Sequence, residues 1–313
     1  MIMRVLVTGG GGFIGSATAR RLRGDGFEPR AGVRRDRADQ SCVRCDLDDP
    51  EQIAAAIKGA DAVVHAGYGV EARMERQCAA LLEAMRAANT RRLIHLSSIA
   101  VYGGAEGLVA ETTRLAPIDR YGAGKAACER LVQEWARSGA GAAMILRPGI
   151  VYGRGSPFWI DKMATRIRCG AWGTFEEAGE GVAALVHVDD VAALISSALA
   201  RLDASAPDVS TMNVAGPQTP SWNVYFTELA SALGSPKLTP LDGAAIARRQ
   251  KLAIAAKLWR KLGLPGLERA ALAPTPGEMA LFARKADYRS DAAESRAGFT
   301  PRIDMAEGLR RSL

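Results

Sequence analysis

The stretch RVLVTGGGGFIG, residues 4–15, passes from a short apolar run into a row of glycines. The run at 4–8 predicts a buried strand, and the apolar spacing at 13–23 predicts a helix. Glycines at such a junction let the backbone approach a phosphate, and the helix start offers free N–H groups and its positive dipole end. The alternative is a tight turn without a ligand, but the strand–turn–helix context favours a dinucleotide site.

Strand-like and helix-like segments continue to alternate through the first half of the chain. We expect strands at 29–33, 42–47, 62–66, 92–97 and 143–147, and helices at 50–58, 72–88 and 120–137. This alternation implies βαβ units and a parallel sheet, whose ligands bind at the carboxyl ends of the strands. The predicted fold is an α/β, Rossmann-type, doubly wound parallel sheet.

The pattern loosens after Pro148. We expect a long connection with one helix at 149–181, a strand end and helix at 187–199, a strand at 211–215, and mostly helices from 221 onward. The predicted Rossmann domain is therefore 1–150 with a returning segment at about 182–215. A smaller, mostly helical substrate-binding lobe is expected at about 151–181 and 216–313.

Composition favours a soluble globular enzyme in the cytoplasm. The chain has 313 residues, 48% of them hydrophobic and 24% charged. No apolar stretch reaches membrane-spanning length, and the N-terminus does not resemble a signal peptide. The net charge is +7, but the arginines are dispersed and aromatics are few. We therefore expect an anionic cofactor or small-molecule substrate and no nucleic acid.

The five cysteines predict neither a disulfide framework nor a zinc site. Their number is odd, which favours reduced thiols. Cys42 and Cys45 form a C-x-x-C pair without a second ligand pair, so we expect two strand cysteines.

Charges after the second predicted strand bear on the choice of dinucleotide. Arg34 and Arg35 suit the 2′-phosphate of NADP, since guanidinium groups pair well with phosphate. Alternatively both are solvated, and Asp36 binds the ribose of NAD. Asp46 and Leu47, after the third strand, are expected to contact the adenine.

Tyr121 and Lys125 stand four residues apart on a predicted helix, and therefore on one face. A nearby ammonium lowers the pKa of a phenol, so Tyr121 is expected to exchange a proton with a substrate hydroxyl or carbonyl. Lys125 is also placed to hold the nicotinamide ribose. Ser97 and Ser98 follow the neighbouring strand and offer a hydroxyl for the substrate oxygen. The alternative is a chance surface pair.

Several motifs occur in an order that resembles the extended short-chain dehydrogenase/reductase family, also called the NAD-dependent epimerase/dehydratase family. They are TGGGGFIG at 8–15, CDLDDP at 45–50, AVVHAG at 62–67, HLSSIAVYG at 95–103, YGAGK at 121–125, LRPGIVYG at 146–153, HVDDVA at 187–192 and GFTPRIDMAEGLRRSL at 298–313. The resemblance implies that Ser98, rather than Ser97, is catalytic with Tyr121 and Lys125. Besides Arg34, Arg35, Asp46 and Leu47, the expected cofactor-binding residues are Gly9, Gly12, Phe13, Ile14, Gly15, Ala66, Lys125 and Pro148.

Two positions depart from the family pattern. Met74 stands where the family usually has an asparagine, which puts the proton relay or the helix geometry in question. The H-x-A-A signature becomes His65-Ala66-Gly67-Tyr68, which places an aromatic ring near the cofactor. His65, His95 and His187 have no metal-ligand spacing, so we expect hydrogen-bonded structural histidines and no metal.

The expected function is an NAD(P)-dependent oxidoreductase that moves hydride between nicotinamide and a carbonyl or hydroxyl group of a small or hydrophobic substrate. Trp159, Trp172 and Trp222 are expected to border the substrate pocket or to lie in the core. A nucleotide-sugar epimerase or dehydratase is the alternative, and a non-catalytic dinucleotide-binding redox sensor is a third. The resemblance also implies a homodimer through the helices at 72–88 and 120–137.

Overall fold

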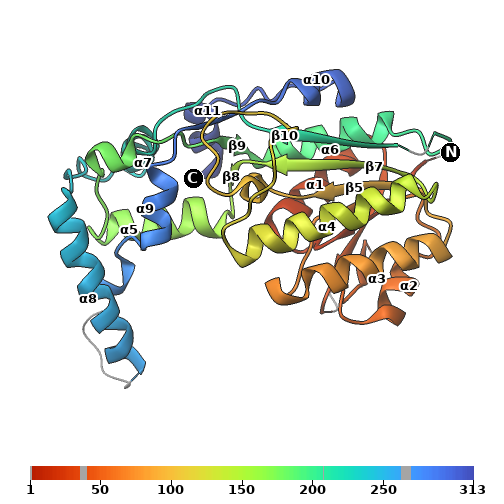
Figure 1. Cartoon of the computed structure of the whole chain (residues 1–313), viewed down its shortest axis with the longest axis horizontal. Helices are drawn as coiled ribbons and strands as arrows, with labels where there is room; N and C mark the ends of the chain where they lie inside the picture. Colours follow the sequence, from red (N-terminus) through yellow and green to blue (C-terminus); the bar gives the residue numbers. More distant parts are fainter. Residues whose placement is uncertain (1, 36–40, 207, 262–268) are drawn as a thin grey trace.

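A seven-stranded parallel sheet forms the centre of the molecule (Figure 1). The computed structural model describes residues 2–35, 41–206, 208–261 and 269–313. The strand order is β10-β7-β5-β4-β1-β2-β3. The strands are β1 (Arg4–Thr8), β2 (Glu28–Val33), β3 (Cys42–Arg44), β4 (Ala62–His65), β5 (Arg92–Leu96), β7 (Ala142–Pro148) and β10 (Val209–Val214). Because the chain crosses from β3 to β4, the order reverses beside β1, which is where such sheets bind ligands.

Helices cover both faces of this sheet (Figure 1). One face packs against α1 (Phe13–Gly24), α6 (Val188–Arg201) and α10 (Asp291–Ala297). The other packs against α2 (Pro50–Ile57), α3 (Met74–Ala87) and α4 (Arg120–Arg137). Apolar side chains from both strand faces fill the two cores, as a strand buried on both sides requires. The predicted doubly wound α/β fold is confirmed.

Most of the predicted boundaries are close to those observed. The strand predicted at 42–47 ends at Arg44, so Cys42 lies in β3 and Cys45 lies after it. The helix predicted at 72–88 begins with a 3₁₀ turn, Glu71–Arg73, before α3.

Short strands escaped prediction. β6 (Gly107–Val109) pairs with β11 (Ala286–Tyr288), and β8 (Ile150–Tyr152) pairs with β9 (Leu185–His187). The connection after β8 holds a π-helical turn (Pro157–Asp161), α5 (Lys162–Arg168) and a 3₁₀ turn (Glu176–Gly179). Three-residue strands carry too little periodicity to be recognised. Their pairing nevertheless brings segments that are distant in the sequence next to the residues that follow Ser98 and Pro148.

An aromatic core fills the later part of the chain. It is built around α7 (Trp222–Ala232), α9 (Pro276–Phe282) and α11 (Met305–Ser312). Trp172 and Trp222 are buried there; their ring centroids lie 5.4 Å and 5.7 Å from that of Phe226. Trp159 stacks beside Trp222 at 5.0 Å. These tryptophans therefore stabilise a core, which was the second of the two roles expected for them.

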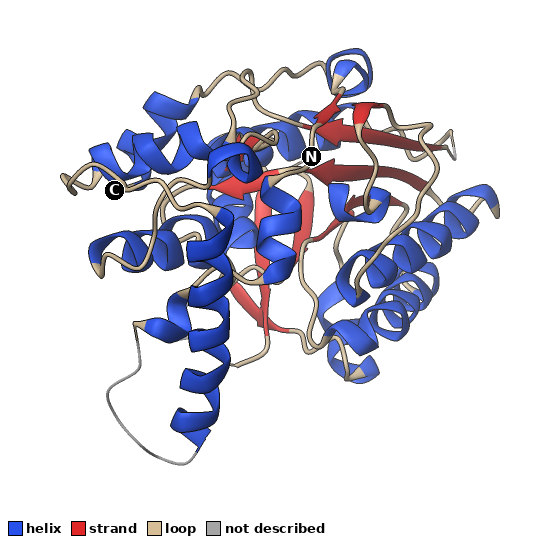
Figure 2. Ribbon diagram, turned by 60° about the vertical axis from the view of Figure 1, so that its left-hand side comes forward, coloured by secondary structure: helices blue, strands red, loops and turns tan. Residues whose placement is uncertain are grey.

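The helix α8 (Gly243–Lys261) projects from the rest of the molecule (Figure 2). Ile246 is buried and Leu252 is exposed. Among the described residues, neither this helix nor any other is long and apolar enough to cross a membrane.

Candidate active site

The glycine loop packs so tightly that side chains are excluded from it. A Cβ atom on Gly9 would lie 2.6 Å from the Cα of Gly67, and one on Gly15 would lie 2.2 Å from the carbonyl oxygen of Gly9. Gly9 also has a positive φ of 66°. Gly12 caps α1 without a side-chain hydrogen bond to the first N–H groups of the helix. The result is a bare cradle at the carboxyl end of β1, as a pyrophosphate site requires.

The other predicted cofactor residues lie around this cradle. Phe13 and Ile14 are partly buried, and their side chains pack toward α6. Arg34 and Arg35 are exposed directly after β2. Asp36, the alternative ribose ligand, lies outside the described residues. These positions keep the NADP and NAD interpretations open.

Asp46 and Leu47 lie in the turn between β3 and α2. Asp46 is partly buried, and its carboxylate accepts the Asp48 N–H at 3.0 Å. Leu47 is buried in the core against α2. Asp46 is therefore the more accessible of the two to an adenine ring.

Ser98, Tyr121 and Lys125 lie together at the carboxyl end of β5. Asp119 caps α4 by accepting the Gly122 N–H at 2.7 Å, which starts the helix just before Tyr121. A Cβ on Gly122 would lie 2.6 Å from the carbonyl oxygen of Ala100, so this glycine allows α4 to pack on the segment that Ser98 begins. Ser98 caps that 3₁₀ turn (Ile99–Tyr102) and hydrogen-bonds to Tyr121.

The two neighbouring serines have different surroundings. The Ser97 hydroxyl donates to the Glu129 carboxylate at 2.5 Å, inside the core. Glu129 in turn pairs with buried Arg147 at 2.6 Å and 2.9 Å. Arg147 also donates to the Tyr102 hydroxyl at 2.6 Å. Sequence reasoning missed this network, although a charged residue inside the apolar strand 142–148 was a signal for it. Ser98 is the serine that faces Tyr121.

The Tyr121 phenol does not have the lowered pKa expected from its neighbour Lys125. The pKa of Tyr121 is raised to about 12, first by burial and then by nearby Tyr68, while the hydrogen bond with Ser98 acts to lower it. The Lys125 ammonium lies 5.9 Å from the Tyr121 ring centroid. Burial also lowers the pKa of Lys125 itself. Removal from water therefore outweighs the attraction between the two groups, and the phenol keeps its proton at neutral pH.

Tyr68 stands over the same site, in the loop after β4. Tyr68 is 44% exposed, and its ring lies 5.7 Å from the ring of Tyr121. The Lys125 nitrogen is 5.2 Å from the Tyr68 centroid, within cation–π range. The sequence predicted an aromatic ring near the cofactor; the ring lies beside Tyr121 and Lys125, and its proximity to a cofactor stays a prediction. Ala66 directly follows β4, and Pro148 is the last residue of β7. Both therefore lie at the same edge of the sheet.

Met74, the other departure, opens α3 and is buried. A Cβ on Gly124 would lie 3.0 Å from the Met74 sulfur, and the Met74 carbonyl accepts the Cys128 thiol at 3.5 Å. The methionine therefore packs α3 against α4.

The histidines are less scattered than the sequence indicated. The ring centroids of His65 and His95 lie 5.1 Å apart with the rings tilted by 41°, and candidate ligand atoms of His65, His95 and Cys78 lie within 4.8 Å of one another. His65 pairs with the Thr8 hydroxyl at 2.9 Å. Neither ring nitrogen of His95 has a partner within the described part of the chain, so the expectation of hydrogen-bonded histidines is wrong for His95. Burial lowers the pKa of both, to about 3 for His65, and keeps them neutral. That no metal binds there stays a prediction.

His187 serves α6. Its Nδ1 accepts the Asp189 N–H at 3.2 Å, which caps the helix. Among the described residues its Nε2 has no partner. This capping contact agrees with the structural role predicted for His187.

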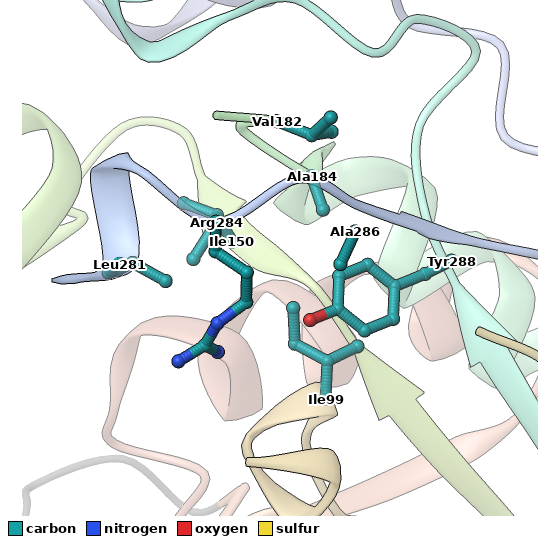
Figure 3. Close-up of a pocket in the computed structure, with 8 residues that line it drawn as sticks. All are labelled: Ile99, Ile150, Val182, Ala184, Leu281, Arg284, Ala286 and Tyr288. Carbon is teal, nitrogen blue, oxygen red and sulfur yellow. The ribbon is translucent and has the colours of Figure 1, made fainter. Parts of the chain in front are cut away.

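A small apolar pocket begins one residue after Ser98 (Figure 3). The polar groups of Arg284 and Tyr288 border it. Burial raises the pKa of Tyr288, and Arg284 opposes that rise through its charge and a hydrogen bond. The pocket is lined by Ile99, Ile150, Val182, Ala184, Leu281, Arg284, Ala286 and Tyr288. Sequence reasoning found none of these residues, because β8 and β11 create the pocket.

Comparison with known proteins identifies relatives along the whole chain. The family model described as "NAD dependent epimerase/dehydratase family" matches residues 5–215. A 2-alkyl-3-oxoalkanoate reductase of Stenotrophomonas maltophilia is 29% identical, with 99% of this chain and 98% of that protein aligned. A 3-diazoavenalumate denitrifying reductase of a Streptomyces species is 30% identical, with 79% and 86% aligned.

Solved structures give the same fold. The structure of MoeE5 in complex with UDP-glucose and NAD superimposes with a TM-score of 0.72 at 26% identity. The match covers 99% of this chain and 97% of that one.

Proposed function

Because the chain belongs to the NAD-dependent epimerase/dehydratase family, we propose that it is an NADP-dependent reductase or dehydrogenase of a small or hydrophobic carbonyl or alcohol. The family is described as NAD dependent, and the similar MoeE5 structure is a complex with NAD. The observation that carries the proposal is the grouping of Ser98, Tyr121 and Lys125 at the carboxyl end of β5. The 2-alkyl-3-oxoalkanoate reductase, whose name gives an oxo group as its substrate, supports a carbonyl-reducing member over a sugar epimerase.

The residues present fit a nicotinamide dinucleotide. Gly9, Gly12 and Gly15 form the cradle that side chains would fill, which suits a pyrophosphate. Lys125 and Pro148 lie on the same sheet edge, where the nicotinamide half would be held. The bound dinucleotide supplies or accepts the hydride.

The protein's own part of the reaction is proton transfer. In the reducing direction Tyr121 gives its phenolic proton to the substrate oxygen, which becomes a hydroxyl. The Ser98 hydroxyl donates a hydrogen bond to the same oxygen and orients it. The phenolate that remains on Tyr121 is stabilised by the Lys125 ammonium until a proton returns from solvent. A phenol that is protonated at neutral pH is suited to this direction.

The preference for NADP rests on Arg34 and Arg35. Both are exposed at the end of β2, where the 2′ position of the adenosine ribose lies in folds of this type. Two guanidinium groups favour a phosphate there over a hydroxyl.

The alternative is a nucleotide-sugar epimerase or dehydratase, which the likeness to a UDP-glucose complex supports. The two functions differ in how they use the dinucleotide. An epimerase recycles one bound NAD, whereas a reductase consumes NADPH. The test is to assay oxidation of NADPH and NADH with a panel of ketones, aldehydes and oxo acids, and to release any dinucleotide from the purified protein. Stoichiometric tightly bound NAD, with isomerisation of a UDP-sugar and no NADPH oxidation, would favour the epimerase.

Two structural parts of the proposal concern assembly. We propose that substrate binds between the Rossmann domain, 1–150 with 182–215, and a lobe formed by 151–181 and 216–313. We also propose a homodimer in which α3 and α4, which pack side by side, meet the same helices of a second copy. Light scattering that gives the mass of one chain would contradict the dimer.

A further inference from the structure

A second hollow lies between the end of α5 and the projecting helix α8, which occupy the same end of the molecule (Figure 1). Its volume is about 340 Å³, within the range of about 300–1,000 Å³ that is usual for small-molecule sites. Ser98, Tyr121 and Lys125 do not line it, so it is separate from the candidate active site. Its side chains are the apolar ones of Ala171, Leu252, Ala270 and Ala273 and the charged ones of Arg249 and Arg269.

The backbone that follows α5 holds both guanidinium groups at this hollow. Arg249 Nη1 donates to the carbonyl oxygen of Ala171 at 3.0 Å, and Arg269 Nη2 donates to that of Gly170 at 2.7 Å. Gly170 has a positive φ of 60°, and a Cβ there would lie 2.8 Å from Arg269 Nη2, so the glycine leaves room for the guanidinium. Two arginines that are far apart in the sequence are thereby brought to one place.

These two arginines have no counter-charge in the part of the chain that the structure describes. Neither forms an ion pair with a carboxylate there, whereas Arg166 of α5 pairs with Glu278. Burial lowers the pKa of Arg249, and the positive charges of Arg269 and Arg248 lower it further. A guanidinium has five N–H donors, and capping the carbonyl groups after α5 uses one from each side chain. The remaining donors and the uncompensated charge suit an anion from outside the protein.

We propose that this hollow binds a phosphate group attached to an apolar group, with Arg249 and Arg269 holding the phosphate. A phosphate monoester carries nearly two negative charges at neutral pH and has three acceptor oxygens, which matches two guanidinium groups. A carboxylate has a single charge and two oxygens, which one guanidinium satisfies. The apolar group lies against Leu252, Ala270 and Ala273.

Leu252 and Arg249 lie three residues apart on α8, so both side chains lie on the same side of the helix. Leu252 is about half exposed and Arg249 is partly buried. Sequence reasoning gave no sign of the site, because Arg269 and Gly170 reach it from segments that only the fold brings together. A soluble phosphate ester and the headgroup of phosphatidic acid share the chemistry that this arrangement recognises.

The first test is calorimetric titration of the protein with hexyl phosphate, inorganic phosphate and hexanoate. We expect hexyl phosphate to bind most tightly, because only this compound has both the doubly charged head and the apolar chain. Arg249→Met and Arg269→Met should each weaken its binding by roughly 10- to 100-fold. Leu252→Ser should weaken the binding of hexyl phosphate and leave that of inorganic phosphate nearly unchanged.

Arg248→Met is the matched control. It removes one positive charge from the neighbouring exposed position of the same helix, which does not line the hollow. The affinity for hexyl phosphate should therefore fall by no more than about threefold. Arg269→Lys keeps the charge without the planar fork and should retain part of the affinity. Arg269 is exposed, so if the melting curve shows that Arg249→Met does not fold, the two Arg269 variants decide the result.

A second experiment identifies the source of the phosphate. The protein is sedimented with phosphatidylcholine vesicles that either contain or lack phosphatidic acid. Binding only to the vesicles with phosphatidic acid, and its loss in Arg269→Met, would support the site and assign it to a lipid headgroup. Binding of hexyl phosphate in the calorimeter without binding to either vesicle would support the site and assign it to a soluble ester.

Two results would overturn the phosphate site. One is that the wild-type protein binds hexyl phosphate no more tightly than hexanoate. The other is that Arg248→Met weakens the binding as much as Arg269→Met, which would mean that the general positive charge of α8 attracts the anion. Neither experiment depends on turnover, so the site and the proposed reductase activity stand or fall separately.

Discussion

The ammonium nitrogen of Lys125 donates a 2.7 Å hydrogen bond to the carbonyl oxygen of Leu96, the last residue of β5. This bond joins the first turns of α4 to the strand end that precedes Ser98. It also directs the charge toward the backbone, and the ammonium nitrogen lies 5.9 Å from the Tyr121 ring centroid. The proton on Tyr121 is therefore governed mainly by burial, and the predictions for the site follow from that.

Tyr121→Phe should abolish most of the activity without loss of cofactor binding. The substitution removes only the hydroxyl, so packing and the dinucleotide cradle are preserved. We expect NADPH-dependent reduction to fall by about 10²- to 10⁴-fold, the usual contribution of a positioned acid. NADPH affinity, measured by fluorescence titration, should be unchanged. Full activity in this variant would exclude Tyr121 as the acid.

The high pKa of Tyr121 predicts a specific pH dependence. With its pKa at about 12, the phenol stays protonated throughout the neutral and mildly alkaline range. Reduction should therefore not fall through loss of this proton between about pH 7 and about pH 9. Oxidation of the alcohol needs the phenolate, so its rate should rise with pH over the same interval. If Tyr121 were instead ionised at neutral pH, reduction would fall as the pH rises and oxidation would be independent of pH. Profiles of kcat/KM in both directions distinguish the two cases.

Tyr68 should tune that pKa. Its phenol is the second cause of the raised Tyr121 pKa, after burial. Tyr68→Phe keeps the ring but removes the ionisable group, so the pKa of Tyr121 should fall. Tyr68→Ala also admits water, so the fall should be larger. Ultraviolet titration of the phenols measures both, and an unchanged Tyr121 titration in Tyr68→Ala would contradict the contact.

Gly15→Ala and Gly24→Ala form a matched pair in the same helix. A Cβ at Gly15 would overlap the carbonyl oxygen of Gly9, whereas a Cβ at Gly24 meets nothing within 4 Å. Gly15→Ala should weaken NADPH binding by more than about tenfold and destabilise the fold by roughly 1–3 kcal/mol. Gly24→Ala should leave binding unchanged and should not destabilise the protein. Calorimetry on both variants checks the result, and equal behaviour would contradict the cradle.

Arg34→Ala combined with Arg35→Ala should reverse the dinucleotide preference. Loss of two guanidinium groups near the 2′-phosphate should raise the KM for NADPH by roughly 10- to 100-fold. The KM for NADH, which lacks that phosphate, should change little. Arg137→Ala, which removes an exposed charge at the far end of α4, is the control. A parallel loss with both dinucleotides would count against NADP selectivity.

Glu278 should make the later part of the chain sensitive to acid. Its carboxylate pairs with Arg166 at 2.8 Å and Lys162 at 2.9 Å. Burial acts to raise the pKa of Glu278, but the bonds from Arg166, Thr275 and Lys162 together lower it to about 2. A carboxylate whose pKa is lowered by folding stabilises the folded state at pH values above its pKa in the unfolded chain, which is about 4.3. That contribution is lost as the pH falls toward 2.

Glu278→Gln should therefore destabilise the protein at neutral pH by roughly 3 kcal/mol, because buried Arg166 loses its counter-charge. The difference from wild type should shrink as the pH is lowered through about 4. Denaturant unfolding at a series of pH values measures it. A difference that is constant with pH would mean that the charge of Glu278 does not matter.

The sequence alone determined the parts of the site that local pattern controls. Alternating periodicities identified the parallel sheet, and the strand–glycine–helix junction identified the cradle at Gly9–Gly15. The i,i+4 spacing put Tyr121 and Lys125 on one face, and the family motif selected Ser98 over Ser97. These inferences succeeded because helix and strand geometry fix where neighbouring residues point, and because parallel strands end on one edge of the sheet.

Only the tertiary structure decided the surroundings that give these residues their properties. Burial, not the ammonium of Lys125, sets the pKa of Tyr121 at about 12. Glu129 draws Ser97 into the core, and the pairing of β6 with β11 brings Arg284 and Tyr288 to the pocket beside Ser98. Solvation and pocket shape depend on contacts between segments far apart in the chain. Spacing along the sequence carries no record of those contacts, so the grouping of Ser98, Tyr121 and Lys125 was predictable and the pocket beside it was not.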